Sequence, residues 1–274
     1  MNRRRFLFLT CTMCTLTPIA YPADSEAPEL IARRAFYQIE DQPFNREVTQ
    51  KSTNDIVHVY NLAPTDPWVL IAMSRALLDK GYLHGDSAKL SSYEASDVES
   101  AKAYARKAVE FGPKESMAFI QLARLQIITE DFRGAWENLN RAHELDTEGF
   151  YPWYFRSVIA IRMNDADRAR SALDEAEQRA TAPYQHRWVA ERRISVAKLK
   201  GDPVAQETYY KRAIDMAPTD PHAYGNYAFF LQDQKRYDEA IAYFQKALAI
   251  SPYPIAEEGL RQTIREKNAA SQRP

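Results

Sequence analysis

Two cysteines and five histidines are the side chains in this sequence best suited to redox or metal chemistry. Cys11 and Cys14 form a Cys-x-x-Cys motif, which on a folded domain is typical of a redox or metal site. Both lie inside an apolar run, residues 6–20, so we do not expect the motif on a folded surface. The histidines are widely separated and lack any paired metal-ligand spacing: His58, His84, His143, His186 and His222. No metal site and no cofactor are therefore predicted.

The known motifs of nucleophilic catalysis and nucleotide binding are also missing. The sequence has no Gly-x-Ser-x-Gly motif, no phosphate-binding Gly-rich loop and no dinucleotide fingerprint. Acidic clusters such as Asp238-Glu239 fall where the solvated face of a helix normally carries charge. No catalytic residue is predicted, and we expect a protein that is not an enzyme.

The first 23 residues have the layout of an export signal. Arg3-Arg4-Arg5 precedes the uncharged, mostly apolar residues 6–20, and prolines and alanines follow. The apolar run is shorter than the roughly 20 residues that span a bilayer. We therefore expect a periplasmic or otherwise exported protein; the alternative is an inner-membrane anchor formed by uncleaved residues 6–20. Residues 3–7 also fit the twin-arginine pattern Arg-Arg-x-Phe-Leu, and both this route and the general secretory route stay open.

Loss of residues 1–23 would change the chemistry of the chain. It would remove both cysteines and three arginines but no acid, shifting the net charge from −1 to −4. The exported chain would then have no disulfide and would depend on its core alone. Without a strongly basic composition, nucleic acid is a poor partner. Membrane contact is expected only through an uncleaved leader.

The rest of the chain is expected to be all-helical, because it has few glycines and few segments that alternate like strands. Its clearest feature is a repeat at residues 221–252. The repeat positions, counted from Pro221, are Tyr224, Tyr227, Ala228, Leu231, Ala240, Phe244, Ala247 and Pro252. Their spacings of 3, 4 and 7 place them on one face of each of two helices. The alanines allow close helix contact, and Pro252 stops the second helix.

This stretch resembles the tetratricopeptide repeat (TPR) family. Looser copies occupy 116–149, 150–183 and 187–220, with a three-residue insertion, Tyr184-Gln185-His186, between the last two. A further copy at 65–115 contains an inserted loop, residues 81–97, and the array spans 65–252 in total.

Both ends of the array carry additional helices. Residues 24–64 form a degenerate helix pair with Pro43 between its helices, and residues 253–274 a C-terminal capping helix and tail. The pentapeptide Ala-Pro-Thr-Asp-Pro occurs at 63–67 and 217–221. Each copy is predicted to close one helix and to open the next with Asp as N-cap and Pro in its first turn.

The resemblance implies an all-α fold: a right-handed α-solenoid of antiparallel helix pairs with a concave groove. Family members mostly bind peptides there, on the first helix of each pair. The peptide-binding residues carried over by position are Met73, Ile120, Arg124, Tyr151, Tyr154, Arg162, Trp188, His222 and Phe229. The carboxylate clamp of the chaperone-binding branch is absent, since Val69 and Met73 replace its Lys and Asn.

The predicted groove is apolar and aromatic, which suits an amphipathic helix or an apolar peptide. The alternative is that many of these side chains pack against neighbouring repeats or the inserted loop. We expect a non-catalytic scaffold or adaptor that binds a protein or peptide partner in the cell envelope. The alternatives are a structural subunit of an envelope complex of pilus or secretion type, with a homo-oligomer among the options, or a companion of an exported enzyme. A more distant alternative is an enzyme with its active site in loop 81–97.

Overall fold

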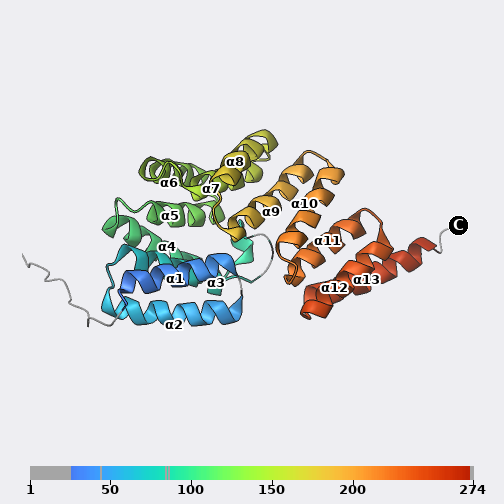
Figure 1. Cartoon of the computed structure of the whole chain (residues 1–274), viewed down its shortest axis with the longest axis horizontal. Helices are drawn as coiled ribbons and strands as arrows, with labels where there is room; N and C mark the ends of the chain where they lie inside the picture. The colour runs from blue at the N-terminus through green and yellow to red at the C-terminus, as the bar shows by residue number, and fades with distance from the viewer. Residues whose placement is uncertain (1–25, 44, 84, 86, 272–274) are drawn as a thin grey trace, which may run out of the picture.

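The computed structural model describes residues 26–43, 45–83, 85 and 87–271, so the expected export signal lies outside the described residues. In these ranges, thirteen α-helices run from α1 to α13 and stack as antiparallel neighbours into a solenoid (Figure 1). The only β-type pairing in the described ranges is an isolated bridge between Tyr82 and Tyr93. The predicted all-α solenoid is confirmed.

The N-terminal helices are α1 (Pro28–Asp41), α2 (Arg46–Leu62), α3 (Pro67–Lys80), α4 (Ala95–Phe111), α5 (Ser116–Ile128), α6 (Phe132–Leu145) and α7 (Phe150–Arg162). The C-terminal helices are α8 (Ala166–Arg179), α9 (Pro183–Leu199), α10 (Pro203–Met216), α11 (Pro221–Asp233), α12 (Tyr237–Ile250) and α13 (Pro254–Ser271). A short 3-10 helix, η1 (Leu90–Ser92), lies between α3 and α4. None of the helices in the described ranges is both long enough and apolar enough to cross a bilayer.

Four helix pairs share the same internal turn. Its central residue has a left-handed backbone: Glu130 (φ 62°), Asn164 (φ 58°), Gly201 (φ 65°) and Lys235 (φ 60°). The following N–H reaches back five residues, as from Asp131 to the Gln126 carbonyl at 2.8 Å, which is a Schellman arrangement. The steps between the four left-handed residues are 34, 37 and 34. They reproduce the repeat length and the three-residue insertion.

The repeated pentapeptide acts as the sequence predicts. The Asp66 carboxylate accepts hydrogen bonds from the backbone N–H groups of Trp68 and Val69, and Asp220 accepts one from His222. A proline follows each aspartate in the first turn of α3 and of α11. Each aspartate satisfies N–H groups that have no partner inside the helix, which contributes about 1 kcal/mol.

Small residues let the paired helices approach closely. The fully buried alanines of these contacts include Ala123, Ala135, Ala142, Ala169, Ala176, Ala228, Ala240 and Ala247. Large side chains such as Leu139, Leu173 and Phe244 fill the space beside them, at about 1.5–3 kcal/mol for each fully buried side chain. One continuous core joins α1 to α9, whereas separate clusters join the helices from α10 to α13.

Two interruptions break the regular stacking. The connection between α3 and α4 is residues 81–94, because α4 begins at Ala95, before the predicted end of the inserted loop. The insertion at 184–186 does not form a loop. It lengthens α9, which has 17 residues where α5, α7 and α11 each have 13. Pro183 and the three inserted residues together add four residues, about one turn, at the start of α9.

Candidate functional site

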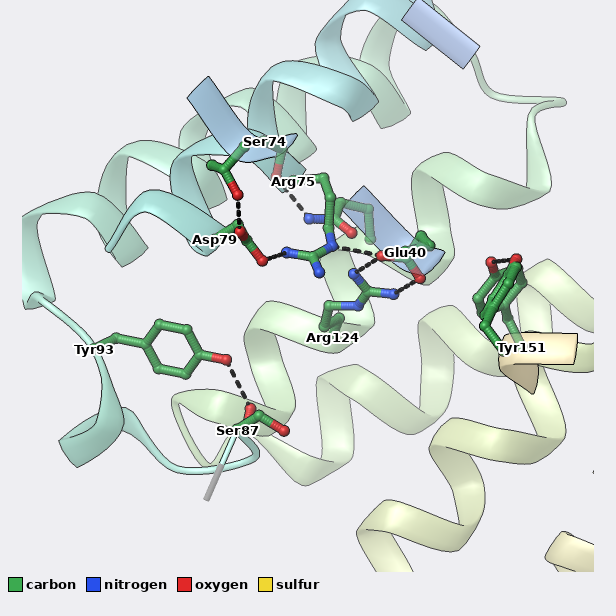
Figure 2. Close-up of polar contacts among 11 residues, drawn as sticks. Glu40, Ser74, Arg75, Asp79, Ser87, Tyr93, Arg124 and Tyr151 are labelled. Carbon is green, nitrogen blue, oxygen red and sulfur yellow. Dashed lines mark hydrogen bonds and ion pairs between the residues drawn. The ribbon is translucent and has the colours of Figure 1, made fainter. Parts of the chain in front are cut away.

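A buried carboxylate on α1 links this helix to α3 and α5, which are the first helices of the next two helix pairs (Figure 2). The Glu40 side chain is fully buried. Arg124 on α5 donates to both of its oxygens at 2.7 Å, and Arg75 on α3 donates to Oε1 at 2.5 Å. Arg75 also donates to Asp79 at 3.1 Å, and the Thr49 hydroxyl of α2 donates to the same carboxylate. The cluster thus joins four helices.

The two arginines keep Glu40 ionised. Burial alone would raise the pKa of its carboxyl, but the charges and hydrogen bonds of Arg124 and Arg75 outweigh burial and lower the pKa below its ordinary value. Two carboxylates, Glu40 and Asp79, face two guanidinium groups, so the charges balance inside the core. Such a cluster is costly to break because the remaining charges would stay buried without partners.

Aromatic side chains fill the concave side of α7 and α9. The Tyr151 hydroxyl lies 2.8 Å from the hydroxyl of Tyr184, and burial raises the pKa of Tyr184 to about 12. The Trp188 ring lies 5.3 Å from the rings of both Tyr154 and Tyr184. Because Tyr184 belongs to the extra turn of α9, the insertion itself contributes to this packing.

Both interruptions of the repeat close the concave face. At one edge, the Ala88 carbonyl of loop 81–94 accepts a hydrogen bond from Arg162 of α7, and Ser87 accepts one from Arg192 of α9 at 3.2 Å. At the other edge, Arg187 of α9 donates to the Asp41 carbonyl at the end of α1, at 2.7 Å. The first and ninth helices therefore meet, and the groove between them is filled by the chain itself.

In the first half of the array, the predicted groove positions are mostly filled by the chain's own side chains. Six of the nine residues predicted to contact a peptide are buried: Met73, Ile120, Arg124, Tyr151, Tyr154 and Trp188. They pack against α1, the extra turn of α9 and each other, which is the alternative raised from the sequence. Arg162 is partly buried between Ala88 and Glu130. Peptide contact by these residues stays a prediction, and in this structure the six buried ones are not accessible to a partner.

The other two predicted residues, His222 and Phe229, lie on α11, where the concave side is open. His222 is exposed and packs against the Tyr253 ring at 4.7 Å between centroids. Phe229 is partly buried and meets Phe244 edge-on at 4.8 Å. Gly259 lets α13 lie against both phenyl rings, because a Cβ there would come within 2.6 Å of Phe244 and 2.8 Å of Phe229.

A hollow of about 350 Å³ opens beside Phe229, between α11, α13 and the start of α12. We call it the C-terminal groove; it is lined by Phe229, Gln232, Asp233, Lys235, Tyr237, Gln262 and Glu266. A second hollow of about 420 Å³ adjoins it and shares Lys235 and Tyr237. The sequence predicted Phe229 as a peptide contact on the concave face but named no residue of α13, because α13 was taken only as a cap.

Amide groups hold the carboxylate of Glu266 in the C-terminal groove. Gln262 donates to Oε1 at 2.8 Å and Gln232 donates to Oε2 at 3.1 Å. These two hydrogen bonds lower the pKa of Glu266, so the group is an anion near neutral pH. The groove therefore combines an aromatic floor with a fixed negative charge, which is suited to binding and contains no nucleophile–base pair.

The comparison with protein families agrees with this geometry. A family model described as tetratricopeptide repeat matches residues 209–242, from α10 through α11 into α12. The chain therefore contains a tetratricopeptide repeat, and its solenoid fold is TPR-like. No curated protein sequence matches this one.

Solved TPR-like structures share the fold at low sequence identity. The human IFIT1 dimer with PPP-AAAA is 16% identical, with a TM-score of 0.64 over 87% of this chain and 53% of that one. TTC0263, a thermophilic TPR protein in Thermus thermophilus, is 16% identical, with a TM-score of 0.55 over 73% of this chain and 99% of that one. The APC/C hetero-tetramer Cut9–Hcn1 gives 15% identity and a TM-score of 0.55, over 87% of this chain and 49% of its match. This TPR protein thus spans about half the length of IFIT1 and of the matched chain in the Cut9–Hcn1 structure.

Proposed function

We propose that this TPR protein is a non-catalytic scaffold of the cell envelope that binds a protein or peptide partner in the C-terminal groove. One observation carries the choice of site. The concave face from α1 to α9 is filled by the chain's own side chains, whereas the groove between α11 and α13 is open and has an aromatic floor. The exported location rests on the leader-like residues 1–23.

The fold supports a binding role. Repeated helix pairs present extended surfaces that suit the capture of other chains. The Cut9–Hcn1 neighbour is itself a complex of two kinds of chain. In this groove, aromatic side chains lie beside polar side chains. Protein interfaces typically have the same arrangement, with an apolar centre and a polar rim.

Site-specific photo-crosslinking in living cells tests the proposal. Benzoylphenylalanine replaces Gln262 in the groove of the full chain, and in a control it replaces Glu137, which is exposed on α6. We expect a discrete adduct from position 262 only. Adducts from position 137 alone would refute the choice of groove. An adduct with the mass of two copies would instead favour the structural-subunit alternative.

Fractionation of the same cells tests the location. Release of the chain with the periplasmic contents is the expected result. Recovery in the inner membrane would favour an anchor at residues 6–20, and recovery in the cytoplasm would refute export.

A further inference from the structure

The charges around the C-terminal groove are not all neutralised within the chain. Arg236 bonds to Glu207 at 2.6 Å and to Glu239 at 2.7 Å, and Lys267 pairs with Asp238. These cations line the adjoining hollow, and each already forms an ion pair with a carboxylate of the chain. In the C-terminal groove itself, neither carboxylate is paired with a cation within the described part of the chain.

Those two carboxylates are Asp233, at the end of α11, and Glu266, on α13. Asp233 is exposed, and the hydrogen-bond partners of Glu266 are two uncharged amides. One cation, Lys235, shares the lining, so the groove carries two negative charges against one positive charge. The opening therefore favours a cation over an anion.

We infer that the C-terminal groove binds a lysine or arginine side chain of the partner, with the aliphatic stem on the aromatic floor and the cationic head between Asp233 and Glu266. This inference rests on the proposed function and adds the chemistry of its ligand. Phe229 and Tyr237 provide apolar surface for the stem, since long basic side chains bury their methylenes while the charge stays solvated. Arginine should bind better than lysine, because its planar guanidinium group also stacks on aromatic rings.

The fixed geometry of Glu266 supports the same assignment. Each of its oxygens already accepts one amide hydrogen bond, which orients the carboxylate. Further lone pairs remain to accept hydrogen bonds from the partner's basic side chain. Gln232 is buried, so its amide is held in place. A carboxylate that is oriented before binding loses less freedom when a guanidinium group arrives.

Two small probes that differ in charge test the inference. N-acetylarginine amide and its uncharged analogue N-acetylcitrulline amide are titrated into the full ¹⁵N-labelled chain. The side-chain amide signals of Gln232 and Gln262 are the readout, because both amides contact Glu266. We expect the arginine probe to shift these signals with a Kd about fivefold below that of the citrulline probe, as for a solvent-accessible ion pair.

Variants show whether the two carboxylates are responsible. The Asp233→Asn, Glu266→Gln double variant is expected to bind both probes equally. The Glu257→Gln variant is the matched control, because Glu257 is exposed on the same helix outside the groove; it should keep the preference. Equal affinities for the two probes in the unaltered chain, no shift of either amide, or a preference that survives in the double variant would overturn the inference.

The outcomes separate this inference from the proposed function. Crosslinking through position 262 without any preference for the arginine probe would leave the groove as the partner site and refute the cation subsite. A preference for arginine with no adduct at position 262 would refute the partner site while the charge recognition stands.

Discussion

The Glu40→Gln substitution should loosen the N-terminal half of the TPR protein. The change keeps the shape of the side chain but removes the charge that Arg75 and Arg124 share. It also points an amide NH₂ group at guanidinium donors. Removing one partner of a buried ion pair typically costs 3–5 kcal/mol, because the remaining charge stays buried. Since Glu40 serves two arginines and is fully buried, we expect a cost near 5 kcal/mol in the free energy of unfolding.

Urea denaturation measures this loss, and hydrogen–deuterium exchange locates it. A cost near 5 kcal/mol corresponds to a protection factor about 4,000-fold lower in α1 and in the adjoining turns of α3 and α5. Glu137→Gln is the matched control, because Glu137 pairs with Arg133 in solvent with 66% of its side chain exposed. This control should change the free energy of unfolding by less than about 0.5 kcal/mol. A Glu40→Gln protein as stable as the control, with unchanged exchange in α1, would refute the role assigned to the cluster.

Three further results follow from the C-terminal half. Gly201→Ala should cost about 1 kcal/mol in urea denaturation, because Gly201 has φ 65° while a Cβ there meets no atom within 4 Å; no loss would contradict the left-handed turn. Gly259→Ala should speed amide exchange in α13, because its Cβ would collide with Phe229 and Phe244; unchanged exchange would contradict the tight packing. Hydrogen bonds from Arg236 and Lys211 lower the pKa of Glu207 to about 2. Its stabilising contribution should therefore be present above pH 4.5 and lost as the pH falls towards 2, and Glu207→Gln should flatten this part of the stability–pH curve.

The helices of the TPR protein were readable from local patterns. The 34-residue spacing, the alanines at helix contacts and the Asp-Pro helix starts are properties of short segments, and each has a direct physical cause. The left-handed turns were less visible. Glycine occupies only one of the four central positions, and Glu130, Asn164 and Lys235 adopt the same backbone without its freedom.

The closure of the concave face could not be predicted from local sequence patterns. It depends on contacts between residues far apart in the chain, such as Glu40 with Arg124 and Asp41 with Arg187. One signal was present in the sequence. Glu40 follows Ala32, Phe36 and Ile39 on the apolar face of α1, and a charge on such a face needs a buried partner. The identity of that partner is set by the curvature of the solenoid, which a repeat pattern does not specify.

The irregular repeats therefore have a structural role. The looser repeats before residue 221 depart further from the family pattern than the repeat at 221–252. In the structure, their departures fill the concave face, through the extra turn of α9 and through loop 81–94. The regular last repeat is left with the open surface.

Thiol labelling of single-cysteine variants tests this contrast most directly and needs no partner. Cys11 and Cys14 are the only cysteines, so changing both to serine gives a chain without thiols. Val158→Cys then places a thiol on the concave side of α7, where the native side chain is 3% exposed. Gln262→Cys places one in the C-terminal groove. We predict that maleimide labels the Val158→Cys variant at least a hundredfold more slowly than the Gln262→Cys variant under native conditions, because labelling of a buried thiol requires local opening. Comparable rates for the two variants would contradict a concave face closed by the chain itself.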